Sequence, residues 1–219
     1  MSPLVVGFDL DMTLIDPRPG IAATLRALAA ETGVAIDVER AVGRLGPPLD
    51  EELARWFSAE SVPAMADRFR AIYPTAAILP TSPFDGAAGA VAAVRAAGGR
   101  SVVITAKYAP NARLHLDHCG IDVADLVGWA WGDGKRDALV AHGASVYVGD
   151  HTADMRSARA AFGDRGAAVG VTTGPCSEAE LYDAGADVVL DSLRDFPEWL
   201  ATWTADRQSG WAAGDLSLA

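Results

Sequence analysis

The chain has 219 residues, of which 50% are hydrophobic and 21% charged, and this composition is typical of a folded protein with a substantial core. Its 29 acidic and 18 basic residues give a net charge of −11, which argues against nucleic acid or an anionic membrane as a partner. The two cysteines, Cys119 and Cys176, predict neither a disulfide framework nor a zinc site.

Apolar runs rich in valine and isoleucine predict buried parallel strands. They lie at residues 4–8, 100–105, 144–149 and 166–172, with a weaker run at 186–190. Helical patterns that close on glycine separate the later runs, at residues 83–99, 109–120, 134–143, 152–163 and 177–185. Strands that alternate with helices predict an α/β fold with a doubly wound parallel sheet.

The segment 17–80 interrupts this alternation, because it holds only helical patterns, at residues 20–33, 50–59 and 62–74. About sixty residues are too many for a simple crossover, and proline-rich stretches stand at both edges. We therefore predict an all-helical cap inserted after the first strand. The predicted division is a core formed by residues 1–16 and 81–205, a cap over 17–80, and a loosely attached tail over 206–219.

No apolar stretch approaches the length of a membrane span, which is about 18 residues. The first residues also lack the basic start and apolar core of a signal peptide. We expect a soluble cytoplasmic protein, either monomer or homodimer, without a membrane or nucleic acid partner.

Polar side chains gather where the predicted strands end, and in open α/β sheets ligands bind at that edge. They are Asp9, Asp11 and Thr13 after the first strand, Thr105 and Ala106 after the second, Lys135 near the start of the helix before the third, and Asp150 and Asp154 after the third. Clustered carboxylates repel one another, and Mg²⁺ offsets that repulsion and prefers such hard oxygen ligands. The pattern predicts a magnesium site, with Asp9 and Asp150 facing the ion from adjacent strands.

Phosphoryl transfer is the chemistry that uses this set of groups. One carboxylate can attack phosphorus as a nucleophile, and a second carboxyl group can protonate the leaving oxygen and then activate water. Thr105 and Lys135 can stabilise the charge on the phosphoryl oxygens.

Four short motifs in order carry a family resemblance. "DLDMTLID" at residues 9–16 resembles the DxDxT motif of the haloacid dehalogenase-like (HAD) phosphohydrolases. Thr105 resembles the second motif of that family, Lys135 the third, and "GDHTAD" at 149–154 the fourth. With the helical insertion after the first motif, the chain resembles the phosphoglycolate phosphatase-like subgroup over about residues 4 to 200.

The resemblance implies a role for each matching residue. Asp9 would be the nucleophile and a Mg²⁺ ligand, and Asp11 the general acid/base, with its backbone carbonyl also on the metal. Asp150 would be a further metal ligand. Phosphate would be held by Thr105, the Ala106 amide and Lys135, and the site would be supported by Thr13 and Asp154.

Some positions depart from the family pattern or have no assigned role. Met12 stands where glycine is usual, and His151 where a small hydroxyl residue is common. In the cap, Arg18 and Arg44 are candidates for binding a substrate anion. We expect Lys107 to flank the site and assign no role to the helical histidines, among them His115.

The predicted function is Mg²⁺-dependent hydrolysis of a small phosphorylated metabolite, phosphoglycolate or a sugar phosphate, through an aspartyl-phosphate. A phosphomutase of the β-phosphoglucomutase type is the first alternative. A phospho-accepting module that resembles receiver domains is a more distant one, because their phosphorylated aspartate follows the third strand. An inactive binding protein is a further alternative, and the intact motifs argue against it.

Overall fold

The computed structural model describes the backbone of residues 3–215 and the side chains of residues 3–207. Six parallel strands form one sheet in the order β5-β4-β1-β6-β7-β8. They are β1 Val5–Phe8, β4 Arg100–Ile104, β5 Asp125–Val127, β6 Val146–Gly149, β7 Ala167–Val171 and β8 Val188–Leu190. This confirms the predicted doubly wound α/β class. Of the strands in this sheet, only β5 was not predicted, because its three half-buried residues at the sheet edge make no apolar run.

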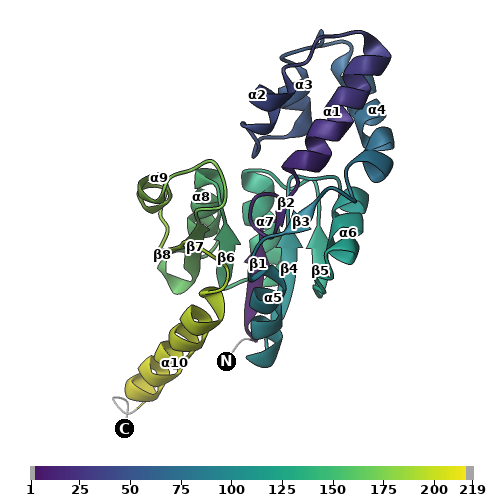
Figure 1. Cartoon of the computed structure of the whole chain (residues 1–219). Coiled ribbons are helices and arrows are strands. Elements are labelled where there is room, and N and C mark those ends of the chain that lie inside the picture. The colour runs from purple at the N-terminus through teal and green to yellow at the C-terminus, as the bar shows by residue number, and fades with distance from the viewer. Residues whose placement is uncertain (1–2, 216–219) are drawn as a thin grey trace.

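Helices cover both faces of this sheet (Figure 1). One core contains residues of α5 Ala87–Ala96, α6 Ala109–His118 and α10 Phe196–Asp215. The other contains residues of α7 Asp133–His142, α8 Thr152–Phe162 and α9 Glu178–Asp183, and a short 3₁₀ turn, Gly163–Arg165, follows α8. Side chains of a strand alternate between the two cores, so Val6 and Phe8 pack into the first and Val5 into the second.

Between the first and second strands of the main sheet, four helices precede α5: α1 Arg18–Thr32, α2 Val38–Val42, α3 Leu49–Leu53 and α4 Val62–Ala76. They pack around a separate hydrophobic core of their own. Figure 1 shows this cap standing over the carboxyl ends of the strands. The two segments that connect the cap to the core pair as a small antiparallel ribbon, β2 Ile15–Asp16 with β3 Ser82–Pro83. The predicted boundaries at 17 and 80 stay a prediction, and they fall beside this ribbon.

The C-terminal segment differs from the expected tail, because α10 continues through Asp215. No amphipathic stripe marks this helix, which is why the sequence pattern did not predict it. Residues 216–219 of the predicted tail lie outside the described residues. In the part of the chain that the structure describes, no helix is both long enough and apolar enough to cross a membrane.

Candidate active site

Three neighbouring strand ends bring the predicted residues together. Strand β1 lies between β4 and β6 in the sheet, so the residues that follow these strands share one edge. Asp9 follows β1, Thr105 follows β4 and Asp150 follows β6, and all three side chains are buried. The sequence thus folds its scattered motifs into one site beneath the cap.

Lys135 connects the nucleophile candidate to the fourth motif. Its ammonium lies 2.9 Å from Asp9 Oδ2 and 2.6 Å from Asp154 Oδ1. Asp154 Oδ2 also accepts a hydrogen bond from the His151 backbone amide, so this carboxylate is held on both oxygens. Desolvation acts to lower the pKa of Lys135, but Asp154 and Asp9 outweigh it and raise that pKa well above its usual value. Lys135 is therefore a fixed buried cation.

The pKa values of the Asp9 and Asp150 carboxyl groups are both raised. Burial, the largest cause, and the repulsion from Asp154 raise the pKa of Asp9 to about 7, against the attraction of Lys135. Burial and the charges of Asp154 and Asp9 likewise raise the pKa of Asp150 well above its usual range. The Thr13 hydroxyl donates to Asp150 Oδ1 at 2.8 Å, which only partly relieves this. A bound cation would therefore stabilise the ionised form of these two carboxyl groups.

The donor set fits a magnesium ion. Carboxylate oxygens of Asp9, Asp150 and Asp154 lie within 4.8 Å of one another, and all three residues are buried. Hard oxygen donors of this kind suit Mg²⁺, which takes one or two carboxylates and completes its shell with water and phosphate. Asp9 lines the cavity beneath the cap and Asp150 follows the adjacent strand, so we expect these two carboxylates to hold the ion. Asp154, bound to Lys135 and to the His151 amide, stays the predicted supporting residue.

Asp11 faces a second lysine. Strand β1 ends at Phe8, so Asp9 and Asp11 do not continue it as a regular alternating pair. Lys107 Nζ lies 2.7 Å from Asp11 Oδ2, whereas Asp9 binds Lys135. Lysines 107 and 135 are the only two in the sequence, and each pairs with one aspartate of the first motif.

Met12, the departure from the family pattern, adopts a left-handed backbone conformation with φ of 63°. Glycine takes this conformation without strain, which explains the usual glycine at this position. The Met12 side chain is buried, and its carbonyl accepts a hydrogen bond of 2.5 Å from the Thr173 hydroxyl. Thr173 belongs to the loop that follows β7. In that loop, a Cβ at Gly174 would collide with the Asp150 carboxylate, so only glycine fits there. The loop after β7 is thus a wall of the site.

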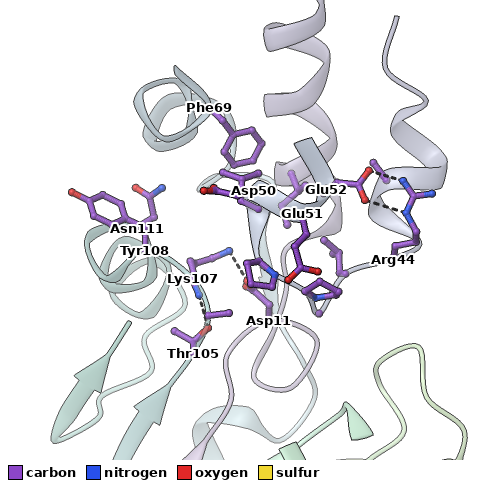
Figure 2. Close-up of a pocket in the computed structure, with 18 of the residues that line it drawn as sticks. Asp11, Arg44, Asp50, Glu51, Glu52, Phe69, Thr105, Lys107, Tyr108 and Asn111 are labelled. Carbon is purple, nitrogen blue, oxygen red and sulfur yellow. Dashed lines mark hydrogen bonds and ion pairs between the residues drawn. The ribbon is translucent and has the colours of Figure 1, made fainter. Parts of the chain in front are cut away.

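A cavity of about 410 Å³ lies between the cap and this edge of the sheet (Figure 2). Its floor contains Asp9, Asp11, Thr105, Ala106 and Lys107. The cap side and the rim are a mixture of apolar, aromatic and charged side chains, namely Ile21, Leu25, Ala41, Arg44, Leu45, Gly46, Pro47, Pro48, Leu49, Asp50, Glu51, Glu52, Arg55, Phe69, Arg70, Tyr73, Tyr108, Asn111 and Trp129. The nucleophile and acid/base candidates therefore open onto one space that is large enough for a small molecule.

The two predicted cap arginines lie in different places. Arg44 lines the cavity, but its guanidinium binds both carboxylate oxygens of Glu52, at 3.0 Å and 2.5 Å (Figure 2). Arg18 does not line the cavity and pairs with Asp16 beside the hinge. Both arginines thus have carboxylate partners within the described chain.

His151, the other departure, joins the core to the cap. Its Nδ1 accepts a hydrogen bond from the Ala153 amide and caps α8. Its ring also packs on Gly46 of the cap, where an added Cβ would lie 3.1 Å from the His151 Cδ2. A small hydroxyl residue could cap the helix but could not reach the cap.

Sequence reasoning missed two groups at the site. Lys107 is a direct partner of Asp11, although it was expected only to flank the site. Tyr73 comes from cap helix α4 and is not part of any recognisable motif, yet its hydroxyl lies 2.8 Å from Lys107 Nζ. The rarity of lysine in the chain was the available signal for Lys107. No sequence signal marks Tyr73, because only the folded cap brings it there.

Comparison with known proteins supports the family resemblance. The sequence model of the haloacid dehalogenase-like hydrolase family matches residues 6–159. The chain is 34% identical over 173 residues to the tyrosine-protein kinase PtkA of Mycobacterium tuberculosis, a match that covers 73% of this chain and 60% of that protein. It is also 30% identical over 226 residues to the phosphoglycolate phosphatase of Rhodospirillum rubrum, which covers 90% of this chain and 91% of that protein.

Solved structures agree on the fold. A haloacid dehalogenase-like family hydrolase from Streptococcus pneumoniae superposes with a TM-score of 0.76 at 22% identity and covers 92% of this chain and 99% of that one. The family match, the full-length phosphoglycolate phosphatase relative and this shared fold confirm the predicted membership. The chain belongs to the haloacid dehalogenase-like hydrolase family, in its phosphoglycolate phosphatase-like subgroup.

Proposed function

We propose that this protein is a phosphatase that hydrolyses a small phosphate monoester with Mg²⁺, through an aspartyl-phosphate on Asp9. One observation carries the proposal: both aspartates of the first motif open onto one cavity, and each is held by its own buried lysine. Two carboxyl groups with separate partners can take the separate roles of nucleophile and acid/base. Full-length relatives named as phosphatases support the same reaction class.

The first step divides between these two carboxyl groups. An oxygen of the Asp9 carboxylate attacks phosphorus, and the bond between phosphorus and the leaving oxygen breaks. Asp11 gives its proton to that oxygen, so that the product leaves as a neutral alcohol. Lys135, which pairs with Asp9, and Thr105, which lines the cavity, would offset the charge on the phosphoryl oxygens. Mg²⁺ held by Asp9 and Asp150 would supply further charge neutralisation.

The second step restores the enzyme. Asp11, now a carboxylate, takes a proton from a water molecule as that water attacks phosphorus of the aspartyl-phosphate. The bond between phosphorus and the Asp9 oxygen breaks, inorganic phosphate forms, and Asp9 returns as a carboxylate. Asp11 thus ends the cycle protonated, as it began.

The cap end of the cavity supports a leaving group without a carboxylate. Arg44 binds Glu52, and Arg70 binds Asp50 and stacks over the Trp129 ring at 4.5 Å. In the described chain, these cavity arginines already have carboxylate partners. Of the two predicted substrates, this charge balance favours a sugar phosphate or another neutral ester over phosphoglycolate.

A phosphate-release assay tests the reaction. The chain with Mg²⁺ should release inorganic phosphate from p-nitrophenyl phosphate and from members of a sugar phosphate panel. Asp9→Asn should abolish release, because an amide cannot form the phosphoenzyme, whereas Asp117→Asn on the exposed face of α6 should retain it. An active Asp9→Asn variant, or no turnover of any ester by the unchanged chain, would contradict the proposal.

Two alternatives have distinct products. A phosphomutase would return the phosphoryl group to a sugar and yield an isomeric sugar phosphate with little free phosphate. A protein-tyrosine kinase, the activity in the name of the 34% identical mycobacterial relative, would move phosphate from ATP to tyrosine. The match covers 60% of that relative, so its activity is a second candidate only. Labelled ATP with a tyrosine-containing peptide separates it from hydrolysis.

A further inference from the structure

A buried hydrogen-bond network joins the cap to the acid/base candidate. Lys107 Nζ lies 2.7 Å from Asp11 Oδ2 and 2.8 Å from the Tyr73 hydroxyl. The Tyr73 hydroxyl lies 2.9 Å from Nε2 of His115 on α6. Tyr73 belongs to cap helix α4, whereas the other three residues belong to the core. Tyr73 is only 2% exposed and His115 is fully buried, so water does not compete for these contacts.

The direction of each hydrogen bond follows from the donors available. A lysine ammonium can only donate, so the Tyr73 oxygen accepts from Lys107. The Tyr73 hydroxyl hydrogen is then free to donate to Nε2 of His115, which accepts it in the tautomer protonated at Nδ1. Burial lowers the pKa of His115 to about 4, so the ring is neutral and can accept. With His115 in that tautomer, the donors run from Lys107 to Tyr73 and on to His115.

Packing alone does not need this hydroxyl. The Tyr73 ring contacts Phe69 and His115, with ring centroids 5.4 Å apart in both pairs, and phenylalanine could make the same contacts. Besides its hydrogen bond to His115, the hydroxyl gives the Lys107 ammonium a fixed partner. That ammonium also lies 4.9 Å from the centre of the Tyr73 ring, a favourable cation–π position. Tyr73 thus orients Lys107 through both its oxygen and its ring.

The orientation of Lys107 in turn decides how Asp11 is held. Oδ2 of Asp11 binds Lys107, whereas its buried Oδ1 has no hydrogen-bond partner among the residues that the structure describes. One oxygen is therefore anchored and the other is left for exchange of a proton. Without a fixed ammonium, the carboxyl group would rotate among several orientations.

We propose that Tyr73 is a positioning residue for Asp11, acting through Lys107, so that the cap sets the geometry of proton transfer in the core. The inference rests on the proposed phosphatase function and deepens it. Asp11 is in place only while α4 keeps Tyr73 against Lys107. Proton donation to the leaving group is thus tied to the position of the cap by two hydrogen bonds.

Two substrates of similar shape separate this role from a structural one. Phenyl phosphate has a basic leaving group that needs a proton, whereas p-nitrophenolate is a weak base that departs without one. kcat/KM reports the steps up to departure of the leaving group. We expect Tyr73→Phe to lower kcat/KM for phenyl phosphate about tenfold, a part of the 10²–10⁴-fold typical of a general acid. For p-nitrophenyl phosphate the loss should stay below about twofold.

Matched variants complete the experiment. Tyr182→Phe removes a hydroxyl from α9, away from the site, and should change neither value. Lys107→Met should show the same selective loss as Tyr73→Phe, and it carries the test if Tyr73→Phe does not fold. Equal losses for both esters in either folded variant, or no loss in either, would overturn the positioning role. A chain that hydrolyses neither ester before mutation would instead overturn the proposed function itself.

Discussion

At the scale of single residues, Met12 balances two opposing free energies. Its φ of 63° places a side chain where an L-residue loses about 1 kcal/mol relative to glycine. Its side chain is 4% exposed, and burial of a methionine contributes about 1.5 to 3 kcal/mol. The burial exceeds the backbone cost, so methionine at this turn of the first motif stabilises the fold.

Two variants of Met12 test this balance. Met12→Ala loses most of the buried area and keeps the strained backbone, so we expect the free energy of unfolding to fall by about 2 kcal/mol. Met12→Gly loses the same area but relieves the strain, so the fall should be about 1 kcal/mol. Urea denaturation monitored by circular dichroism measures both. A Met12→Ala variant as stable as Met12→Gly would show that the backbone carries no strain.

His115 should make the fold sensitive to mild acid. Its pKa falls from 6.5 to about 4, first because of burial and then because of the Lys107 charge. A lowered pKa means that its contribution to stability is complete above pH 6.5 and is lost as the pH falls toward 4. We expect the free energy of unfolding to drop by about 2 kcal/mol between pH 7 and pH 5 from this group. Urea titrations at both pH values measure the drop.

The matched control for that acid sensitivity is His115→Gln, which cannot titrate. It should be less stable than the unchanged chain at pH 7 yet lose about 2 kcal/mol less on going to pH 5. The same pH dependence in both proteins would mean that His115 is not the group responsible.

At the scale of elements, the strands and the site differ in what sequence alone reveals. Buried strands leave long apolar runs in the sequence. A polar residue directly after such a run can therefore be assigned to the end of a strand, as with Asp9, Thr105 and Asp150. Strand β5 and helix α2 are too short to leave a pattern. Tyr73 could not be assigned at all, because its partner lies across an interface between separately packed units. Patterns along the chain encode elements, but contacts between elements need the fold.

Helix α3 presents a carboxylate that should select among substrates. Glu51 lines the cavity and points toward Asp11 in Figure 2, and it makes no side-chain hydrogen bond or ion pair within the described residues. It would repel a substrate carboxylate by up to about 1 kcal/mol at short range in water. Glu51→Gln should therefore raise kcat/KM for phosphoglycolate about threefold relative to a neutral sugar phosphate. Steady-state kinetics on both esters measure the ratio.

Glu60→Gln changes an exposed cap residue outside the cavity lining and serves as the control for charge alone. Its ratio should equal that of the unchanged chain. If both variants shift the ratio equally, the net charge of the cap, and not the place of Glu51, governs the preference.

At the scale of the whole molecule, the metal and the fold are linked through two carboxyl groups. Raised pKa values for Asp9 and Asp150 mean that the metal-free fold holds these groups best when they are protonated. Stability of the metal-free protein is therefore greatest at low pH from this source and is lost as the pH rises through about 7. A bound cation replaces the protons and removes that loss.

Magnesium should accordingly raise the melting temperature more at pH 8 than at pH 6. At pH 6 it must displace protons from Asp9 and Asp150, whereas at pH 8 it meets carboxylates that repel one another. Differential scanning fluorimetry at both pH values, with sodium chloride at matched ionic strength as the control, measures the shift. Asp150→Asn should abolish the difference, and an equal shift at both pH values would contradict the link.

The placement of the two lysines also has a consequence for the chemical handling of this protein. Their side chains are 8% and 1% exposed, and the sequence contains no others. The folded surface of the described chain thus offers no lysine amine to dyes, acylating reagents or cross-linkers. Labelling at lysine would therefore report opening of the active site or loss of the fold. Acetylation of either lysine would remove its ion pair with Asp11 or Asp9 and so impair the proposed reaction.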